Sequence, residues 1–255
     1  MSLLKVEEIS ISFGGLRAVS NFSLDLGAQE LVGLIGPNGA GKTTIFNMLT
    51  GVYHPEAGNI MLNGRSVTGM PPYKINRMGI ARTFQNIRLF NDLSVLDNVK
   101  IAYQYLGGYS WRDAIFRSKR YRRKEKEITE WAMELLSIFG LAENRNELAR
   151  NLPYGAQRRL EIARALAAKP KLLLLDEPAA GMNPQETMDL MSLVKKVRAE
   201  FDLTILLIEH DMSFVMNLCE RIIVLDYGQT IAEGAPDEIK SNPRVIQAYL
   251  GGEVS

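Results

Sequence analysis

Residues 36–44 read Gly-Pro-Asn-Gly-Ala-Gly-Lys-Thr-Thr and fit the pattern G-x-x-x-x-G-K-[ST] of phosphate-binding loops. The glycines let the backbone curl so that its N–H groups point at a phosphate, and a following helix adds unpaired N–H groups and partial positive charge. Lys42 is expected to reach the outer phosphates, and the Thr43 hydroxyl is expected to bind Mg²⁺. The predicted nucleotide-binding residues of this loop are Gly36, Pro37, Asn38, Gly39, Ala40, Gly41, Lys42, Thr43 and Thr44.

Two carboxylates, Asp176 and Glu177, directly follow a run of four leucines at residues 172–175. The run predicts a buried strand, and parallel sheets bind ligands at the carboxyl ends of their strands. Asp176 is therefore expected to hold Mg²⁺ through water beside Thr43. Glu177 is expected to orient an attacking water or to accept its proton.

Two further polar side chains stand at the ends of predicted strands. His210 follows the apolar run 203–208 and can donate its ring N–H to a γ-phosphate, where charge develops. Gln85 follows the predicted strand 80–84, and its amide can contact Mg²⁺ or the attacking water. For either residue alone, a solvated surface position is the simpler interpretation. Their occurrence at neighbouring strand ends favours a role in hydrolysis.

An aromatic residue, Phe13, ends the first predicted strand, which alternates apolar and polar residues over 4–13. A ring at this position can stack on adenine or pack into the core. Position alone does not separate these two interpretations.

The elements that must position these residues alternate between helix and strand in the first and last thirds of the chain. This alternation predicts an α/β fold in which helices cover both faces of a parallel sheet. An antiparallel pair of strands is expected at the N-terminus, and residues 85–160 show no strand pattern. Strands are predicted at 4–13, 22–26, 31–35, 58–63, 80–84, 171–176, 203–208, 221–226 and 229–233. Helices are predicted at 44–50, 94–104, 157–168, 184–200, 212–218, 236–240 and 243–250. A short helix is predicted to begin at Pro71 and Pro72. The span 111–139 is predicted to form one helix or two.

Composition narrows the class of protein. The 255 residues are 46% hydrophobic and 23% charged, which is typical of a soluble globular chain, and the net charge of +1 gives no overall field that favours nucleic acid. Cys219 is the one cysteine, which excludes an intrachain disulfide, suits a reducing cytosol and favours a small buried side chain. The aliphatic runs are too short to span a bilayer, so a membrane role would require another protein to bring the chain there.

Taken in order, these motifs resemble the ATP-binding subunits of ABC transporters over nearly the whole chain. Residues 36–43 resemble the Walker A motif, Gln85 the Q-loop, Asp176 and Glu177 the Walker B motif with its glutamate, and His210 the H-loop. Residues 152–166, Leu-Pro-Tyr-Gly-Ala-Gln-Arg-Arg-Leu-Glu-Ile-Ala-Arg-Ala-Leu, resemble the signature motif and the helix after it.

The resemblance implies an α/β fold of the P-loop NTPase (RecA-like) type, with a parallel-sheet core, an N-terminal antiparallel β subdomain and an inserted helical subdomain. It implies a single cassette over 1–255, divided into a core at 1–84 and 161–255 and a helical subdomain at 85–160. It also implies ATP and Mg²⁺ as cofactors, with Glu177 as general base, Phe13 on adenine, and Thr43, Gln85 and Asp176 as magnesium residues.

The same resemblance implies partners. Two ATP-binding subunits, identical or different, pack head to tail, and each ATP lies between one chain's Walker A motif and the other chain's Tyr154 and Gly155. Two membrane permeases and, indirectly, an extracytoplasmic binding protein complete such an importer, and nucleic acid is not a partner. The implied location is the cytoplasmic face of the cell membrane, as a peripheral subunit.

Within the family, residues 82–90, 178–184, 208–212 and the insert between 107 and 127 resemble importers of branched-chain amino acids. Importers of another amino acid, urea or an amide are the alternatives, because the cargo does not touch this subunit. A soluble ABC ATPase acting on ribosomes or nucleic acid is a second alternative, although such proteins usually carry two cassettes or a distinctive linker. The chain departs from the usual motifs at Pro153, Tyr154, Ala156 and Asn183.

A dense basic run occupies residues 117–124 in the predicted helical region. A solvated helix face, paired partly with Glu125 and Glu127, is the simpler interpretation and the one favoured here. Contact with anionic lipid is the alternative, because polybasic segments are attracted to such surfaces.

Overall fold

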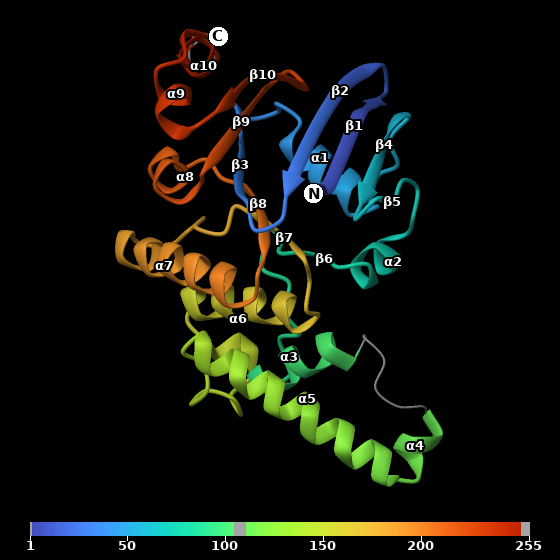
Figure 1. Cartoon of the computed structure of the whole chain (residues 1–255). Coiled ribbons are helices and arrows are strands. Elements are labelled where there is room, and N and C mark those ends of the chain that lie inside the picture. Colours follow the sequence, from blue (N-terminus) through green and yellow to red (C-terminus); the bar gives the residue numbers. More distant parts are fainter. Residues whose placement is uncertain (1, 105–110, 251–255) are drawn as a thin grey trace.

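The computed structural model describes residues 2–104 and 111–250, and their strands form two sheets (Figure 1). The N-terminal sheet has the antiparallel order β2-β1-β4-β5. A hairpin turn at Gly14 and Gly15 joins its first two strands, and one face of the sheet is buried. The strands of this sheet are β1 (Ser2–Phe13), β2 (Leu16–Gly27), β4 (Ala57–Leu62) and β5 (Arg65–Ser66).

The central sheet has the order β10-β9-β3-β8-β7-β6. Its strands run parallel except for the edge strand β10, which pairs antiparallel with β9. Every residue of β3, β7 and β8 is buried, as expected where both faces of a sheet are covered. The strands of this sheet are β3 (Leu31–Ile35), β6 (Ile80–Arg82), β7 (Leu172–Asp176), β8 (Thr204–Ile208), β9 (Arg221–Asp226) and β10 (Gln229–Gly234).

Helices follow the strands of the central sheet and lie on its two sides. Side chains of neighbouring residues in one strand, such as Leu174 and Leu175 of β7, enter two different hydrophobic clusters. The cluster with Leu174 also holds apolar residues of the N-terminal sheet, and the cluster with Leu175 holds those of the helical region. The helices around the sheets are α1 (Lys42–Leu49), α2 (Pro72–Arg77), α6 (Tyr154–Ala167), α7 (Pro184–Glu200), α8 (Met212–Leu218), α9 (Pro236–Lys240) and α10 (Pro243–Leu250).

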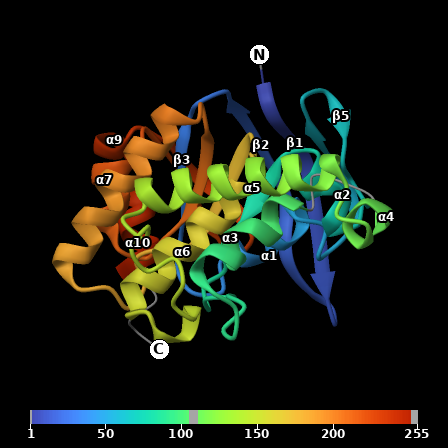
Figure 2. The same cartoon turned by 90° about the horizontal axis from the view of Figure 1, so that it is seen from below.

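The middle of the chain forms a helical region that projects from the central sheet (Figures 1 and 2). It contains α3 (Val95–Gln104), α4 (Trp111–Ile115), α5 (Lys119–Ile138) and a short 3₁₀ helix (Ala149–Asn151). Its described residues contain no strand, in agreement with the sequence, apart from one bridge between Ser94 and Leu148. No helix in the described part of the chain is both long and apolar enough to cross a membrane.

Several predicted bounds were wrong. The helix predicted from residue 157 begins at Tyr154, because Pro153 suits a helix start, where a missing N–H costs nothing. The strand predicted at 22–26 begins at Leu16, since the tight hairpin allows pairing from the turn onward. The strand predicted to reach Phe84 ends at Arg82. For the span 111–139, where one helix or two was predicted, the second alternative is confirmed, because the backbone turns at Arg117, which has φ 44°. Residues 107–110 of the insert between 107 and 127 lie outside the described residues.

Candidate functional site

The phosphate-binding loop connects β3 to α1 and needs glycine at two close approaches. Gly36 has φ 150°, and a Cβ atom there would lie 2.2 Å from the Leu225 carbonyl oxygen. Gly41 has φ 101°, and a Cβ atom there would lie 2.7 Å from the Ala18 carbonyl oxygen. L-residues rarely adopt such φ values, so the loop conformation depends on these two positions.

Lys42 lies inside this loop. Its Nζ donates hydrogen bonds to the carbonyl oxygens of Gly36 at 2.6 Å and Pro37 at 2.8 Å. Burial lowers the pKa of Lys42, and the nearby carboxylates of Glu177 and Asp176 oppose that shift. The ammonium group is thus placed at the mouth of the loop, next to two carboxylates, where a phosphate can receive its hydrogen bonds.

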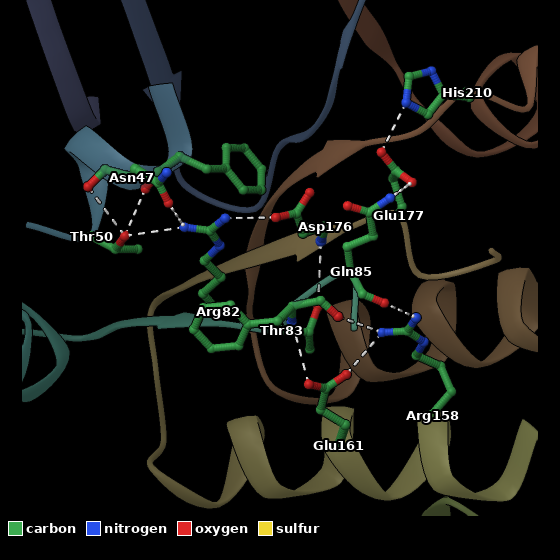
Figure 3. A network of polar contacts seen from close by, with 12 residues as sticks. Asn47, Thr50, Arg82, Thr83, Gln85, Arg158, Glu161, Asp176, Glu177 and His210 are labelled. Atoms are coloured by element: carbon green, nitrogen blue, oxygen red, sulfur yellow. Dashed lines mark hydrogen bonds and ion pairs between the residues drawn. The ribbon is translucent and has the colours of Figure 1, made fainter. Parts of the chain in front are cut away.

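Glu177 lies between Gln85 and His210 (Figure 3). The Gln85 amide nitrogen donates to one oxygen of Glu177 at 2.8 Å, and the His210 Nε2 atom lies 2.8 Å from the other. Glu177 has φ 48°, in the left-handed region, and its N–H donates to the carbonyl oxygen of Ile208 at 2.9 Å. Backbone strain of this kind is common at functional sites. Two distant segments, that of Gln85 and that of residues 208–210, therefore fix the position of Glu177.

Arg82 and Asp176 form a buried ion pair that the sequence did not reveal. The Arg82 Nη2 atom lies 2.6 Å from Asp176 Oδ2, and both side chains are almost wholly buried. Arg82 also donates to Asn47 of α1 at 2.7 Å, so it ties β7 to the helix that follows the phosphate-binding loop. The one available sequence signal was a charged residue inside the apolar run before Gln85.

The oxygen donors at this site fit Mg²⁺. The described residues contain no cluster of three or more His, Cys, Asp or Glu side chains that could enclose a metal ion. Thr43 and Asp176 offer a hydroxyl and a carboxylate, and Mg²⁺ is usually bound by one or two such groups together with phosphate oxygens and water. One oxygen of Asp176 is occupied by Arg82, and the other is not used in a hydrogen bond among the described residues.

Arg158 and Glu161, on α6, form a second buried ion pair at 2.9 Å. Arg158 also donates to the carbonyl oxygens of Phe84 at 2.6 Å and Gln85 at 2.7 Å. Glu161 accepts from the backbone N–H of Phe84 at 3.4 Å and Arg88 at 3.1 Å. These bonds fasten the segment around Gln85 to α6, and sequence reasoning missed both residues.

Tyr154 and Gly155 lie in the first turn of α6. The Tyr154 hydroxyl donates to the carbonyl oxygen of Ala180 at 3.0 Å, and its ring lies against Gly181. Asn183 caps α7 through a capping box with Glu186. Two of the unusual residues, Tyr154 and Asn183, therefore stabilise the segment between β7 and α7.

Phe13 is 43% exposed, so the core-packing interpretation was wrong. Its ring contacts Tyr53 edge-on, with the centroids 5.1 Å apart. An exposed ring remains available for stacking. Cys219, by contrast, is buried as expected, and burial raises its pKa to about 12.

Comparison with known proteins gives consistent results. Residues 19–180 match the family model described as "ABC transporter", and residues 229–255 match the model described as "Branched-chain amino acid ATP-binding cassette transporter". The chain is 46% identical over 249 residues to the high-affinity branched-chain amino acid transport ATP-binding protein BraF of Pseudomonas aeruginosa, with 98% of each chain covered. It is 47% identical over 249 residues to the corresponding protein LivG of Escherichia coli, again with 98% of each covered.

A more distant relative and a solved structure extend the comparison. The lipopolysaccharide export system ATP-binding protein LptB of Escherichia coli is 36% identical over 251 residues, with 98% of each chain covered. The crystal structure of the ADP conformation of MJ1267, an ATP-binding cassette of an ABC transporter, has a TM-score of 0.86 at 31% identity. That match covers 98% of this chain and 99% of the other.

Proposed function

The chain belongs to the ABC transporter family as an ATP-binding cassette, and from this premise we propose that it powers an importer of branched-chain amino acids. As a member of this family it is an ATPase. The observation that carries the proposal is the position of Glu177, held by Gln85 and His210 directly after the buried Asp176. Such a carboxylate is suited to activate water at a nucleotide.

In the proposed reaction, the loop 36–44 binds the phosphates through backbone N–H groups and Lys42. Lys42 exchanges its bonds to loop carbonyls for bonds to the outer phosphates. Glu177 accepts a proton from the attacking water, Gln85 orients that water, and His210 donates a hydrogen bond toward the γ-phosphate. Mg²⁺, held by Thr43, Asp176 and Gln85, would neutralise phosphate charge. Phe13 would stack on adenine.

The proposed assembly contains a second cassette, whose ATP would meet the start of α6 of this chain. Pro153 supplies neither a hydroxyl nor an N–H, so the backbone N–H groups of Tyr154 and Gly155 are the proposed donors to that ATP. The carbonyl of Pro153 already accepts from Gln157 at 2.9 Å, within the helix.

The proposed contact with the permeases lies on the helical region, residues 85–160, which we treat as a subdomain. Residues 86–96 run from the segment around Gln85 into the start of α3, and the exposed Phe90 lies within them. A permease helix docked here would sense movements of Gln85. This arrangement would place the chain at the cytoplasmic face of the membrane, with a binding protein on the other side.

The choice of cargo is supported by similarity to other proteins. BraF of Pseudomonas aeruginosa and LivG of Escherichia coli, both named for branched-chain amino acids, are 46% and 47% identical to the chain, whereas the lipopolysaccharide export protein is 36% identical. The match of residues 229–255 to the branched-chain model supports the same choice. Import of another amino acid, urea or an amide is the competing cargo assignment.

A transport assay tests the proposal. Cells lacking this chain are complemented with wild type or Glu177→Gln, and uptake of labelled leucine, glutamine and urea is measured. We expect wild type to restore leucine uptake and Glu177→Gln to fail although permeases co-purify with it. Restoration of urea or glutamine uptake alone would contradict the cargo. Co-purification of ribosomes instead of permeases would contradict transport.

A further inference from the structure

The helical region ends in a positively charged tip, residues 111–124, formed by α4 and the start of α5. Residues 111–124 contain seven basic residues and one acidic residue, a net charge of +6 in a chain whose total is +1. The rest of the chain therefore carries −5. Figure 1 shows the tip at the end of the helical region far from both sheets. The exposed basic side chains of the tip are Arg112, Arg117, Lys119, Arg120, Arg122 and Arg123.

The ion pairing expected for the basic run 117–124 is found in part. Glu127 pairs with Lys124 at 2.7 Å, and Glu125 pairs with Lys100 of α3 at 2.9 Å. Among the described residues, no ion pair is formed by Arg117, Arg120, Arg122 or Arg123. The expected partial pairing is therefore confirmed for Lys124 with Glu127 but does not extend to these four arginines, whose charge stays at the surface of the tip.

Two apolar side chains lie within the same tip. Ile115 is 66% exposed and Phe116 is 79% exposed, at the end of α4 and directly before Arg117. A single exposed apolar residue is ordinary. Two adjacent ones, surrounded by exposed arginines, form an amphipathic surface of the kind that enters a membrane interface.

We propose that this tip binds anionic phospholipid, with the arginines on the headgroup phosphates and with Ile115 and Phe116 at the boundary with the acyl chains. Nucleic acid would satisfy the arginines but offers no hydrocarbon layer for both apolar side chains. The proposal rests on the proposed function only in that permeases would bring this helical region to a membrane. The tip would then hold the cassette against the leaflet beside them.

The full chain is tested for sedimentation with vesicles of phosphatidylcholine alone or mixed with phosphatidylglycerol, in the absence of nucleotide and permease. One variant carries Arg120→Gln, Arg122→Gln and Arg123→Gln. A matched variant carries Arg65→Gln, Lys240→Gln and Arg244→Gln, which are exposed residues outside the tip. Each basic residue near an anionic surface is worth roughly a fivefold change in affinity, so the tip variant should bind about 100-fold more weakly. The matched variant should stay close to wild type.

Two further measurements separate lipid insertion from general attraction. Ile115→Ser with Phe116→Ser should weaken binding to anionic vesicles about tenfold without changing its salt dependence. Because Trp111 also lies in α4, the second measurement, of tryptophan fluorescence, uses chains in which Trp111 is replaced by Phe. In these chains the tryptophan of Phe116→Trp should be quenched by brominated acyl chains more strongly than Trp131 of α5 is. Thermal unfolding of each variant shows whether it is folded.

The proposal would be overturned if the tip variant and the matched variant lost vesicle affinity equally. It would also be overturned if wild type bound anionic vesicles no more tightly than vesicles of phosphatidylcholine alone. Tighter binding of single-stranded RNA than of vesicles would overturn it in favour of a nucleic-acid surface. Leucine uptake is measured in parallel, so that a failure of the lipid-binding proposal can be distinguished from a failure of the proposed transport function. Failure of lipid binding would leave uptake by wild type intact, and failure of the proposed function would leave vesicle binding intact.

Discussion

Arg158 donates a hydrogen bond of 2.7 Å from α6 to the backbone carbonyl of Gln85, whose side chain in turn donates to Glu177. Arg158 is itself held by Glu161, and it lies 3.3 Å from the Tyr154 hydroxyl. One buried guanidinium therefore connects the start of α6 with the residue that orients the proposed general base (Figure 3).

This relationship predicts a specific defect in Glu161→Gln. The glutamine oxygen can still accept the N–H groups of Phe84 and Arg88, but its amide nitrogen then faces Arg158, a second donor. Loss of a bond to a charged group, with a buried donor left unpaired, costs about 1–3 kcal/mol of the free energy of unfolding. We expect kcat for ATP hydrolysis to fall while ATP affinity stays near wild type, because Lys42 and its loop are untouched.

Glu143→Gln, at an exposed position of the same helical region, is the matched control. ATP affinity, kcat and denaturant unfolding are measured for both variants. A Glu161→Gln variant that loses stability yet keeps kcat would show that the ion pair only supports the fold.

Much of the fold could be predicted from local patterns, because α/β proteins repeat short apolar strands and capped helices. The buried strands β7 and β8 and the helix α7 are examples, since each was predicted from a local apolar pattern. The long-range polar pairs could not be predicted this way. Arg82 and Asp176 are 94 positions apart, and nothing in their spacing indicates contact. The residues with motif spacing were found, whereas those that hold them in place were not.

Cys219 is predicted to react with a thiol reagent only after unfolding. Burial raises its pKa to about 12, whereas an unfolded cysteine has a pKa of about 8.5. At pH 8 the folded thiolate fraction is lower by roughly 10³-fold. Alkylation followed by mass spectrometry, with and without denaturant, checks this. Rapid labelling of the native chain would mean that Cys219 is accessible.

The same shift has a consequence for stability. Because the folded pKa lies above the unfolded one, the stabilising contribution of this thiol is complete below about pH 8 and is lost as pH rises toward 12. The free energy of unfolding of wild type, compared with that of Cys219→Ala, should therefore decrease between about pH 8 and pH 10. An unchanged difference over that range would count against the shift.

Pro153→Ser is predicted to speed hydrolysis at the ATP that α6 meets in the assembled transporter. Pro153 is the N-cap of α6 and offers no side-chain acceptor or donor. A serine hydroxyl would add a bond to a charged phosphate, worth about 1.5–3 kcal/mol. It would also cap the helix, which is worth about 1 kcal/mol. Single-turnover hydrolysis is measured for assembled transporters that contain wild type or Pro153→Ser. An unchanged or slower rate in the variant would mean that Tyr154 or the helix start already makes the contact with the phosphate.

Phosphate release by Glu177→Gln tests the account most directly. ATP binding and steady-state release are measured on the purified chain and on the assembled transporter, with Glu200→Gln as an exposed control. Because Glu177 is the proposed general base, we predict that ATP binding is retained and that hydrolysis falls about 10²–10⁴-fold, with the control unaffected. Near-normal phosphate release by Glu177→Gln would contradict the assignment of Glu177 as the base.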